Sequence, residues 1–511
     1  MRDLPWLSLI VFLPAIGAMV LTRIRSVSTI RATAAACSGA SFAMLAAMFA
    51  LLERSDTEAW RVERYEWVAS LGLSYTLAID GLSVVFAGFA AFLCFVTVTA
   101  SFRNVKHDDR GFHMAVLGLQ SMVLGAILSR DLFLFFLFFQ ASLLPMFFLI
   151  GGWGGEKRVP AATKYAVYSG FGGLALLAGI AAVCVNGRRV LGSLTFDLDE
   201  LARVGIPDAI EPWIFAAFLV GFATRIPLFP LHSWFPEAQS EAPPSGAVLL
   251  SGVMIPLGIY GLVRVMVPLL PEATLDFGPL LVPVLLIGLL YGACLGMAQH
   301  DMRKRLAYVS VSQLSLIALG VFALDITSIE GALLMALSHG LVLGAILVLL
   351  GILEERLEIR SLFAAEGLGR EAPAFAALLG LAAFALIGVP GLSGFVGELL
   401  VFRGLFEHHP AWALLAAVGT VFVAVYTLML VRRVLLGPPD RPGGEPLRDL
   451  TNRERVIAGA LLAASLAMGI APGLIQKPID GPSRTILAPV EEIRFDRLDE
   501  EIAERFEERT R

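Results

Sequence analysis

Long apolar stretches follow one another along most of the chain and are separated by short polar segments. Stretches of 18 or more predominantly apolar residues recur, and each is long enough to cross a lipid bilayer. With roughly 20 residues per span, we count about fourteen spans. They centre near residues 13, 41, 90, 120, 141, 172, 218, 256, 287, 314, 340, 390, 423 and 463. The pattern predicts an all-α, polytopic membrane protein.

Two of these spans carry residues that break a helix. Gly221–Glu237 places Arg225 in an apolar span and then three prolines, and Gly388–Glu398 inserts glycines, a proline and a carboxylate into another. A helix broken at membrane depth persists only where protein or water satisfies the freed backbone groups. The two breaks lie about 165 residues apart, and broken helices in corresponding positions of two halves are typical of transporters built from repeats. We therefore predict two inverted five-helix repeats.

The predicted organisation has four parts. Residues 1–111 hold the first three spans, and residues 112–268 form the first repeat, with spans four to eight. Residues 269–436 form the second repeat, and residues 437–511 hold the last span and a charged tail. Two further helices are expected outside the spans, a short amphipathic one at Phe196–Ala202 and a solvated one from Val490 to the end.

Composition supports a membrane protein and excludes several other classes. Hydrophobic residues make up 57% of the chain and charged residues 16%, whereas soluble domains carry about 25% charged residues. The net charge of -5 is weak for this length, and no basic run predicts nucleic-acid binding. The four cysteines fall in separate apolar segments and no nucleotide-binding glycine motif occurs, so we predict no metal, nucleotide or other cofactor in this chain. The first apolar segment lacks a basic leader and is read as a retained helix.

The distribution of Lys and Arg predicts an orientation. Alternate connections are rich in these residues: Arg23/Arg25/Arg31, Arg103/Lys106/Arg110, Lys157/Arg158, Arg303/Lys304/Arg305, Arg356/Arg360/Arg370 and Arg432/Arg433/Arg441. Loops with a Lys and Arg excess face the cytoplasm. This places the chain in the cell inner (cytoplasmic) membrane with both termini on the outer side.

Ionisable residues inside apolar spans are the candidates for function, because charge in hydrocarbon is costly and is kept for ion pathways. Glu398 and His339 are the foremost candidates, since a buried carboxylate and an imidazole can exchange protons. A hydrated carboxylate at the break and a core histidine bonded to a carbonyl are the structural alternatives. Arg225, which stays protonated in proteins, would set the local field.

Four other polar positions have a strong structural alternative. Lys304 opens the tenth span within a basic cluster that is mainly an orientation signal. Lys164 begins the sixth span, where it would face a cavity or extend to the interface. His232 follows the first break, at a cavity mouth or at the interface. Asp80 is expected to cap the third span at its start.

Several motifs stand in an order that is familiar from one family. These are Asp80–Ser83, Phe138–Gly155, Arg225–Ala238, Ala307–Ser312, Ser338–Gly340 and Gly388–Glu398. The chain resembles the antiporter-like membrane subunits of respiratory complex I, and is most similar to the M type. The resemblance covers roughly residues 5–475. It implies fourteen helices, two inverted repeats and a polar axis at mid-membrane that moves protons. It also implies that quinone reduction takes place in other subunits and that this chain belongs to an H⁺-translocating NADH-quinone oxidoreductase without carrying redox chemistry itself.

The chain departs from the family's charges at four positions, three of them in the first half. Gln140 stands where the family has a glutamate, Arg225 where it has a lysine, Pro256 where it has another lysine, and Gln313 where a histidine is usual. Glutamine does not titrate, and both glutamines could order water. The residues predicted along the proton pathway are Glu398, His339, Arg225, Gln140, Gln313, Lys304, Lys164 and His232.

Two other functions stay open at this point. One is a non-pumping structural paralogue in the same type of complex, which the lost charges favour, and the other is a subunit of a multi-subunit cation/proton antiporter. In each case its partners would be other membrane-arm subunits and the lipid bilayer. Because burial of the Arg225 charge needs compensation, we also predict a carboxylate within its reach, on this chain or on a neighbouring subunit.

Overall fold

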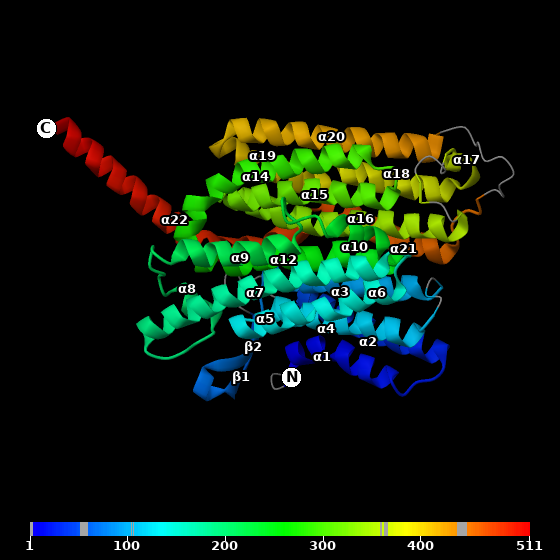
Figure 1. Ribbon diagram of the computed structural model, residues 1–511, viewed down its shortest axis with the longest axis horizontal. Helices are drawn as coiled ribbons and strands as arrows, with labels where there is room; N and C mark the ends of the chain where they lie inside the picture. The colour runs from blue at the N-terminus through cyan, green and yellow to red at the C-terminus, as the bar shows by residue number, and fades with distance from the viewer. Residues whose placement is uncertain are drawn as a thin grey trace.

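The fold is a bundle of long, nearly parallel helices, seen side-on in the computed structural model (Figure 1). The structure describes residues 4–51, 60–103, 105, 107–357, 360–361, 366–436 and 447–510. Lys106 and Arg441, which contribute to the predicted basic loops, lie outside these residues. Each predicted span centre lies in a helix, except for position 390, which lies in the second break.

The elements follow in chain order. The first are α1 (Trp6–Leu21), α2 (Val27–Leu51), β1 (Arg61–Val68), β2 (Leu73–Ile79), α3 (Gly81–Ser101), α4 (Asp109–Leu128), α5 (Leu132–Ala141), α6 (Leu143–Trp153), α7 (Arg158–Leu191) and α8 (Leu198–Ala202). The next are α9 (Glu211–Arg225), α10 (Phe235–Glu241), α11 (Pro244–Leu249), α12 (Ile255–Gly261), α13 (Val267–Leu269), α14 (Pro271–Ala298), α15 (Met302–Phe322) and α16 (Ile326–Leu357). The last are α17 (Leu368–Glu371), α18 (Pro373–Ile387), α19 (Ser393–His408), α20 (Pro410–Leu436), α21 (Asn452–Ile470) and α22 (Gly473–Thr510).

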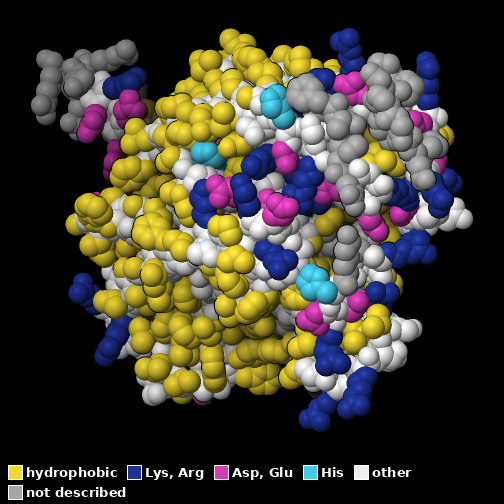
Figure 2. Space-filling view, turned by 45° about the vertical axis from the view of Figure 1, so that its right-hand side comes forward, with side chains coloured by type: hydrophobic (Ala, Val, Ile, Leu, Met, Phe, Trp, Pro, Cys, Tyr) yellow, Lys and Arg dark blue, Asp and Glu magenta, His cyan; other side chains and the backbone are white. Residues whose placement is uncertain are grey.

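The helices are those of a polytopic membrane protein, as predicted. Ten helices of the described chain are long and apolar enough to cross a membrane, or up to eleven if the bent pair α21 and α22 is one span. Two shorter apolar helices, α1 and α18, add to these. Hydrophobic side chains cover the flank of the bundle, and charged side chains gather at the end brought forward in Figure 2. The count of fourteen, the inverted repeats and the domain limits stay predictions.

The strands β1 and β2 form one antiparallel hairpin, with Arg61 opposite Ile79. The hairpin lies at the end of the bundle where the chain starts, because Glu63 accepts the N–H groups of Leu7 and Ser8 at the beginning of α1. The carboxylate thereby satisfies donors that the first turn of a helix leaves free. The two predicted extra helices are present as α8 and α22, although α22 starts at Gly473, earlier than expected.

The helix α22 has a buried base and a projecting outer part. Ile479, Ile486, Leu487 and Val490 are buried. A side chain at Gly81 would overlap the carbonyl of Pro478, so α22 lies directly on the start of α3. Beyond this base the helix leaves the bundle and carries the C-terminus away from it (Figure 1).

The start of α18 is held by the connection that precedes α21. The Asp449 carboxylate accepts the N–H groups of Ala374 and Phe375, each at 3.1 Å. Burial alone would raise the pKa of the Asp449 carboxyl, but these donors and the N–H of Leu450 outweigh burial and hold the pKa below its ordinary value. Asp449 thus fixes the first half of the second broken helix in its ionised form.

The segment from α11 to α13 runs through the centre of the molecule, and its apolar window is entirely buried. Two π-helical stretches interrupt it, Leu250–Met254 and Leu262–Met266. Each ends in an i→i−5 bond from the residue just before a proline, Ile255 before Pro256 and Val267 before Pro268. Proline lacks an N–H and clashes with the preceding turn of an α-helix. The wider turns accommodate Pro256 within a continuous buried segment.

Candidate functional site

The first break follows from its prolines. α9 ends at Arg225 and α10 begins at Phe235. Prolines within residues 226–236 remove N–H donors and disfavour a helical residue before them. The freed carbonyls find partners inside the protein, because the Trp234 indole N–H donates to the Thr224 carbonyl at 3.0 Å and the Leu228 N–H donates to the Ala223 carbonyl at 3.0 Å. Protein groups therefore make this break tolerable at membrane depth.

Arg225 lies in a cradle of neutral groups. Its Nη2 donates to the Phe139 carbonyl at 2.6 Å and to the Ser142 hydroxyl at 3.1 Å, and its Nη1 donates to the Tyr165 hydroxyl at 3.1 Å. The guanidinium also lies 4.4 Å from the centre of the Phe139 ring, where the negative face of the ring attracts a cation. The side chain is buried, with 3% of the residue exposed. The cation is thus immobilised from three directions.

The predicted carboxylate beside Arg225 is absent from the part of the chain that the structure describes. All hydrogen bonds of this guanidinium go to a carbonyl and two hydroxyl groups. Compensation comes instead from these acceptors, from the aromatic face, and from the C-terminal end of α9, where cations are favoured by the helix dipole. For the described residues the prediction was therefore wrong, because several neutral dipoles replace one acid. A carboxylate of a neighbouring subunit stays a prediction.

The other candidates of the first half lie near Arg225 without bonding to it. Gln140 donates to the Ser169 carbonyl at 3.4 Å. The carbonyl of its neighbour Phe139, rather than Gln140 itself, accepts a hydrogen bond from Arg225. Lys164 forms an ion pair with Glu237 at 2.8 Å, which joins α7 to α10 at the end of the bundle where α7 begins. His232 is buried in the break, and its ring stacks on Phe229 with centroids 5.7 Å apart. The sequence named these residues as candidates, and the tertiary structure shows their partners. Their roles in a pathway stay predictions.

The second break is a glycine-terminated helix. Gly388 ends α18 in the left-handed conformation, with φ of 80°. The N–H of Gly388 donates to the Ala385 carbonyl and the N–H of Val389 to the Phe384 carbonyl, which is the Schellman arrangement. A further carbonyl at this helix end, that of Leu386, accepts the side-chain N–H of Gln313 at 3.1 Å. The break is therefore satisfied by protein, as the first one is.

Gln313, His339 and Glu398 meet beside this break. The Nδ1 of His339 lies 2.9 Å from Oε1 of Gln313, and its Nε2 is buried without a hydrogen-bond partner. Glu398 faces Gly388, where a side chain would approach the carboxylate to 2.6 Å. All three residues line one small cavity of about 10 Å³ between α15, α16, α18 and α19, roughly the room that one water molecule needs. The structure thus unites the two foremost sequence candidates and a glutamine in one place.

A row of hydroxyl groups leaves this cavity. Ser338 lines it and lies 2.6 Å from Ser393, which lies 2.7 Å from Ser465. All three side chains are buried, and they link α16, α19 and α21. Sequence reasoning missed this row, because three serines spread over 128 positions carry no local signal. Hydroxyls both donate and accept, so the row extends the polar environment of the cavity toward α21.

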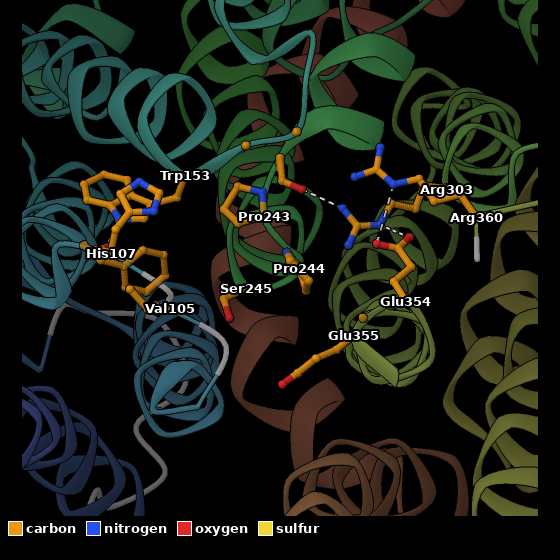
Figure 3. Close-up of a pocket in the computed structure, with 15 residues that line it drawn as sticks. Val105, His107, Trp153, Pro243, Pro244, Ser245, Arg303, Glu354, Glu355 and Arg360 are labelled. Atoms are coloured by element: carbon orange, nitrogen blue, oxygen red, sulfur yellow. Dashed lines mark hydrogen bonds and ion pairs between the residues drawn. The ribbon is translucent and has the colours of Figure 1, made fainter. Parts of the chain in front are cut away.

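Lys304 is only partly buried, whereas Arg303 and Arg305 on either side of it are buried. The Nε of Arg303 lies 2.6 Å from the Glu354 carboxylate, and its Nη1 donates to the Ala242 carbonyl at 2.6 Å. Arg303 and Glu354 line a cavity of about 310 Å³ at the basic end of the bundle, which Figure 3 shows between Trp153 and Arg360. Lys304 does not line this cavity.

A buried charge cluster at the opposite end escaped the sequence analysis. Asp80 caps α3 as predicted, by accepting the Ser83 N–H at 2.8 Å. Its other oxygen lies 2.7 Å from both Arg130 and Arg264. Arg264 stands in an apolar run of the eighth span, so the reasoning applied to Arg225 should also have found it. One carboxylate between two arginines ties α3, the start of α5 and the segment from α11 to α13 together.

The buried segment from α11 to α13 separates the two breaks. On one side, a side chain at Gly258 would touch Arg225, at 3.1 Å from its Cγ. On the other side, the backbones of Gly252 and Gly340 approach within contact distance, next to His339. Pro256 lies between these points, and the one charged residue of the segment, Arg264, is held by Asp80. The hydroxyl of Tyr260, on the same segment, donates to the Ile127 carbonyl. The two halves are therefore adjacent but have no acidic, lysine or histidine side chain between them on this segment.

Comparison with known proteins gives a consistent result. The family model described as "NADH:quinone oxidoreductase/Mrp antiporter, TM" matches residues 129–424. The chain is 34% identical to NAD(P)H-quinone oxidoreductase chain 4 1 of Synechococcus elongatus, over 96% of this chain and 93% of that one. It is 31% identical to NADH-quinone oxidoreductase subunit M of Rickettsia bellii, over 93% and 97%. Among solved structures, a chain of respiratory complex I from Thermus thermophilus with bound NADH superposes with a TM-score of 0.86 at 28% identity, covering 95% and 99% of the two chains.

Proposed function

Because this chain belongs to the NADH:quinone oxidoreductase/Mrp antiporter family, we propose that it is a proton-translocating membrane-arm subunit of a complex I-like assembly. Quinone reduction takes place in other subunits, and this chain couples it to proton transfer inside the bilayer. The chain lies in the inner membrane with its basic end toward the cytoplasm, as the distribution of Lys and Arg predicts.

The observation that carries the proposal is the cavity at the second break. It holds a carboxylate, Glu398, and an imidazole, His339, in a buried polar site beside a broken helix. These two groups can take up and release protons, and Gln313 fixes one ring nitrogen of His339. The other ring nitrogen has no hydrogen-bond partner among the described residues. The site therefore has the chemistry of a proton relay.

The first half contributes a fixed field. Arg225 cannot release its proton, and its bonds to Phe139, Ser142 and Tyr165 hold it in place. No acidic, lysine or histidine side chain on the segment from α11 to α13 bridges it to His339. In the proposed function the proton moves through the second half. The fixed positive charge of Arg225, in the first half, changes the electrostatic energy of that proton without exchanging one.

A second candidate function is a non-pumping spacer in the same assembly. The neutral cradle of Arg225 and the proline at position 256 favour it, because both replace groups that could exchange protons. The intact cavity around Glu398 favours the pumping function. The two candidates differ in one measurable quantity, the number of protons moved per electron.

The partners we propose are neighbouring membrane-arm subunits and the lipid bilayer. Phe495, Leu498 and Ile502 lie exposed on the part of α22 that projects from the bundle. Their spacing of three and four residues places them on one face of the helix. From Glu491 onward, acidic residues outnumber basic ones, which is unsuited to an anionic lipid surface and supports a protein partner.

The test is Glu398→Gln in the assembled, reconstituted complex, with quinone reduction and proton uptake measured together. We expect a lower proton-to-electron ratio while quinone reduction continues. The matched control is Glu407→Gln, since Glu407 lies on the same helix but is exposed and pairs with Arg403, and it should leave the ratio unchanged. An unchanged ratio in Glu398→Gln would establish the spacer function instead.

A further inference from the structure

A second small cavity lies next to the one that holds Glu398. It also has a volume of about 10 Å³, and its lining includes Arg305, Val309, Leu379, Tyr426 and Thr427. The helices α15, α16, α18 and α20 form its walls. Nothing in the proposed relay uses these residues, and Tyr426 attracted no attention in the sequence because a tyrosine in an apolar span is ordinary.

Two polar atoms of this second cavity are buried without a partner. The Tyr426 hydroxyl forms no hydrogen bond with the described residues, although only 1% of this residue is exposed. The Nε of Arg305 is likewise unpartnered, whereas its Nη2 donates to the Met297 carbonyl at 3.2 Å. Buried polar groups are normally hydrogen-bonded, and an exception needs an explanation. Here one aromatic hydroxyl and one guanidinium N–H lie in the same cavity.

The two cavities lie in sequence along the membrane normal. On α15, Arg305 and Val309 line the second cavity, near the basic end, whereas Gln313 and Ile317 line the first cavity. At a rise of 1.5 Å per residue, Arg305 precedes Gln313 by about 12 Å. On α16 the order is reversed, as an antiparallel neighbour requires, with Ile346 in the second cavity.

Leu386 lines both cavities and is the wall between them. It lies in the last turn of α18, directly before the glycines of the second break. Its carbonyl is held by Gln313, while its buried side chain is apolar. The second cavity is lined mostly by apolar side chains, with Arg305, Tyr426 and Thr427 as its polar residues. An apolar side chain between two small water sites excludes water from the gap, which is how hydrophobic constrictions interrupt conduction.

We propose that Arg305 and Tyr426 form a water-binding antechamber through which protons reach Glu398 from the basic end, with Leu386 as the hydrophobic gate. This inference rests on the proposed function and names the side from which its site is supplied. Tyr426 relays the proton: its hydroxyl accepts a hydrogen bond from water on the side of Arg305 and donates one toward the gate.

In the proton step, a hydronium ion on the basic side gives a proton to the Tyr426 oxygen and becomes water, as the phenolic proton passes to the next water. That water, now a hydronium ion, passes one proton across the gate to the Glu398 carboxylate and returns to water. The carboxylic acid forms, and Tyr426 ends as the neutral phenol that it was. No electron moves, and Arg305 keeps its charge throughout because a guanidinium does not deprotonate in proteins.

The position of Leu386 explains why the gate adjoins a broken helix. The backbone at Gly388 and Gly391 has the left-handed conformation, so the end of α18 is not continued by α19 and can shift without breaking a helix. A small displacement of this end would move the Leu386 side chain relative to both cavities. Such a movement would connect or separate the two water sites during turnover.

The first test compares Tyr426→Phe with Tyr260→Phe in the assembled, reconstituted complex. Tyr426 has no partner to lose, so its replacement should leave thermal stability unchanged but lower the proton-to-electron ratio. Tyr260 is equally buried but donates to the Ile127 carbonyl at 2.7 Å, so its replacement should lower stability and leave the ratio unchanged. An unchanged ratio in Tyr426→Phe would overturn the inference.

The second test addresses the gate. Leu386→Ala should join the cavities and give a proton leak in proteoliposomes without any redox reaction, whereas Leu350→Ala, a buried leucine of α16 that lines neither cavity, should give none. Equal leaks in both variants would remove Leu386 as the gate. A density map of the wild-type complex should show water bonded to the Tyr426 hydroxyl, and a dry antechamber would contradict its role.

The outcomes separate the inference from the function on which it rests. If Glu398→Gln lowers the ratio and Tyr426→Phe does not, the relay stands and its supply from the basic end is refuted. If Glu398→Gln has no effect, the relay fails and the antechamber fails with it.

Discussion

Gly388→Ala is the most incisive perturbation of the second break, because it acts on the backbone and on Glu398 at once. Gly388 has φ of 80° and ψ of 43°. An L-residue in this left-handed region costs about 1–2 kcal/mol. Part of this is offset by about 0.4–1 kcal/mol, since alanine restricts the unfolded chain. We expect a net loss of about 1 kcal/mol of stability.

The same substitution displaces the carboxylate. The new Cβ would lie 2.6 Å from Oε2 of Glu398, whereas ordinary contact begins at 3.4 Å. The difference means that the carboxylate must retreat by about 0.8 Å, close to the ~1 Å misplacement that can lower a rate about 10²-fold. Because the obstacle is the end of a flexible side chain, the protein should still fold. We therefore expect a large loss of proton uptake with a small loss of stability.

Gly391→Ala is the matched control. Gly391 also has a left-handed backbone, with φ of 90°, but a side chain there would meet nothing within 4 Å. The control variant therefore has the same kind of backbone strain but does not displace the Glu398 carboxylate. The assay is thermal unfolding of the purified complex together with proton uptake per electron in proteoliposomes. If both variants lower the ratio equally, backbone strain explains the effect and the reasoning about Glu398 is refuted.

Three further predictions concern single contacts. Asp80→Asn leaves two buried guanidinium groups without their shared anion and should destabilise the purified complex by about 3–5 kcal/mol in thermal unfolding, whereas Asp199→Asn, at an exposed carboxylate, should change stability by less than about 1 kcal/mol. Gln313→Leu removes the hydrogen-bond partner of the buried Leu386 carbonyl and that of His339. Each loss should lower the stability by about 1–3 kcal/mol, and an unchanged unfolding temperature of the purified complex would contradict these bonds. Asp449→Ala should lower the unfolding temperature by its full amount above about pH 4, and the effect should fade as the pH falls through the lowered pKa of Asp449, because the carboxylate stabilises the fold only while it is ionised. A difference that persists in acid would show that Asp449 acts through packing.

The composition and the helix-breaking residues of the sequence determined the class of the protein. Apolar stretches of bilayer length have no alternative to helices in lipid, since every backbone group must be satisfied within the segment. The prolines after Arg225 and the glycines around position 388 place both breaks, because proline lacks a donor and glycine alone adopts a left-handed backbone at low cost. The cap at Asp80 follows equally from local chemistry.

The tertiary structure decided which groups face one another. Glu398 and His339 stood out in the sequence as rare ionisable residues, but their shared cavity with Gln313 depends on how α15, α16 and α19 pack. Arg225 was expected to need an acid and instead found the carbonyl of Phe139 and two hydroxyls. Neutral acceptors leave no signal in a sequence, because every residue carries a carbonyl.

The same limit applies to the antechamber. Tyr426 and Arg305 lie 121 positions apart, and neither a tyrosine nor an arginine near a helix end marks a pathway by itself. Their roles arise only when four helices close around them and leave their polar atoms without partners. Local propensity fixed the helices, their ends and their breaks in this protein. The long-range packing of apolar faces, which many sequences satisfy equally well, decided which buried polar atoms meet.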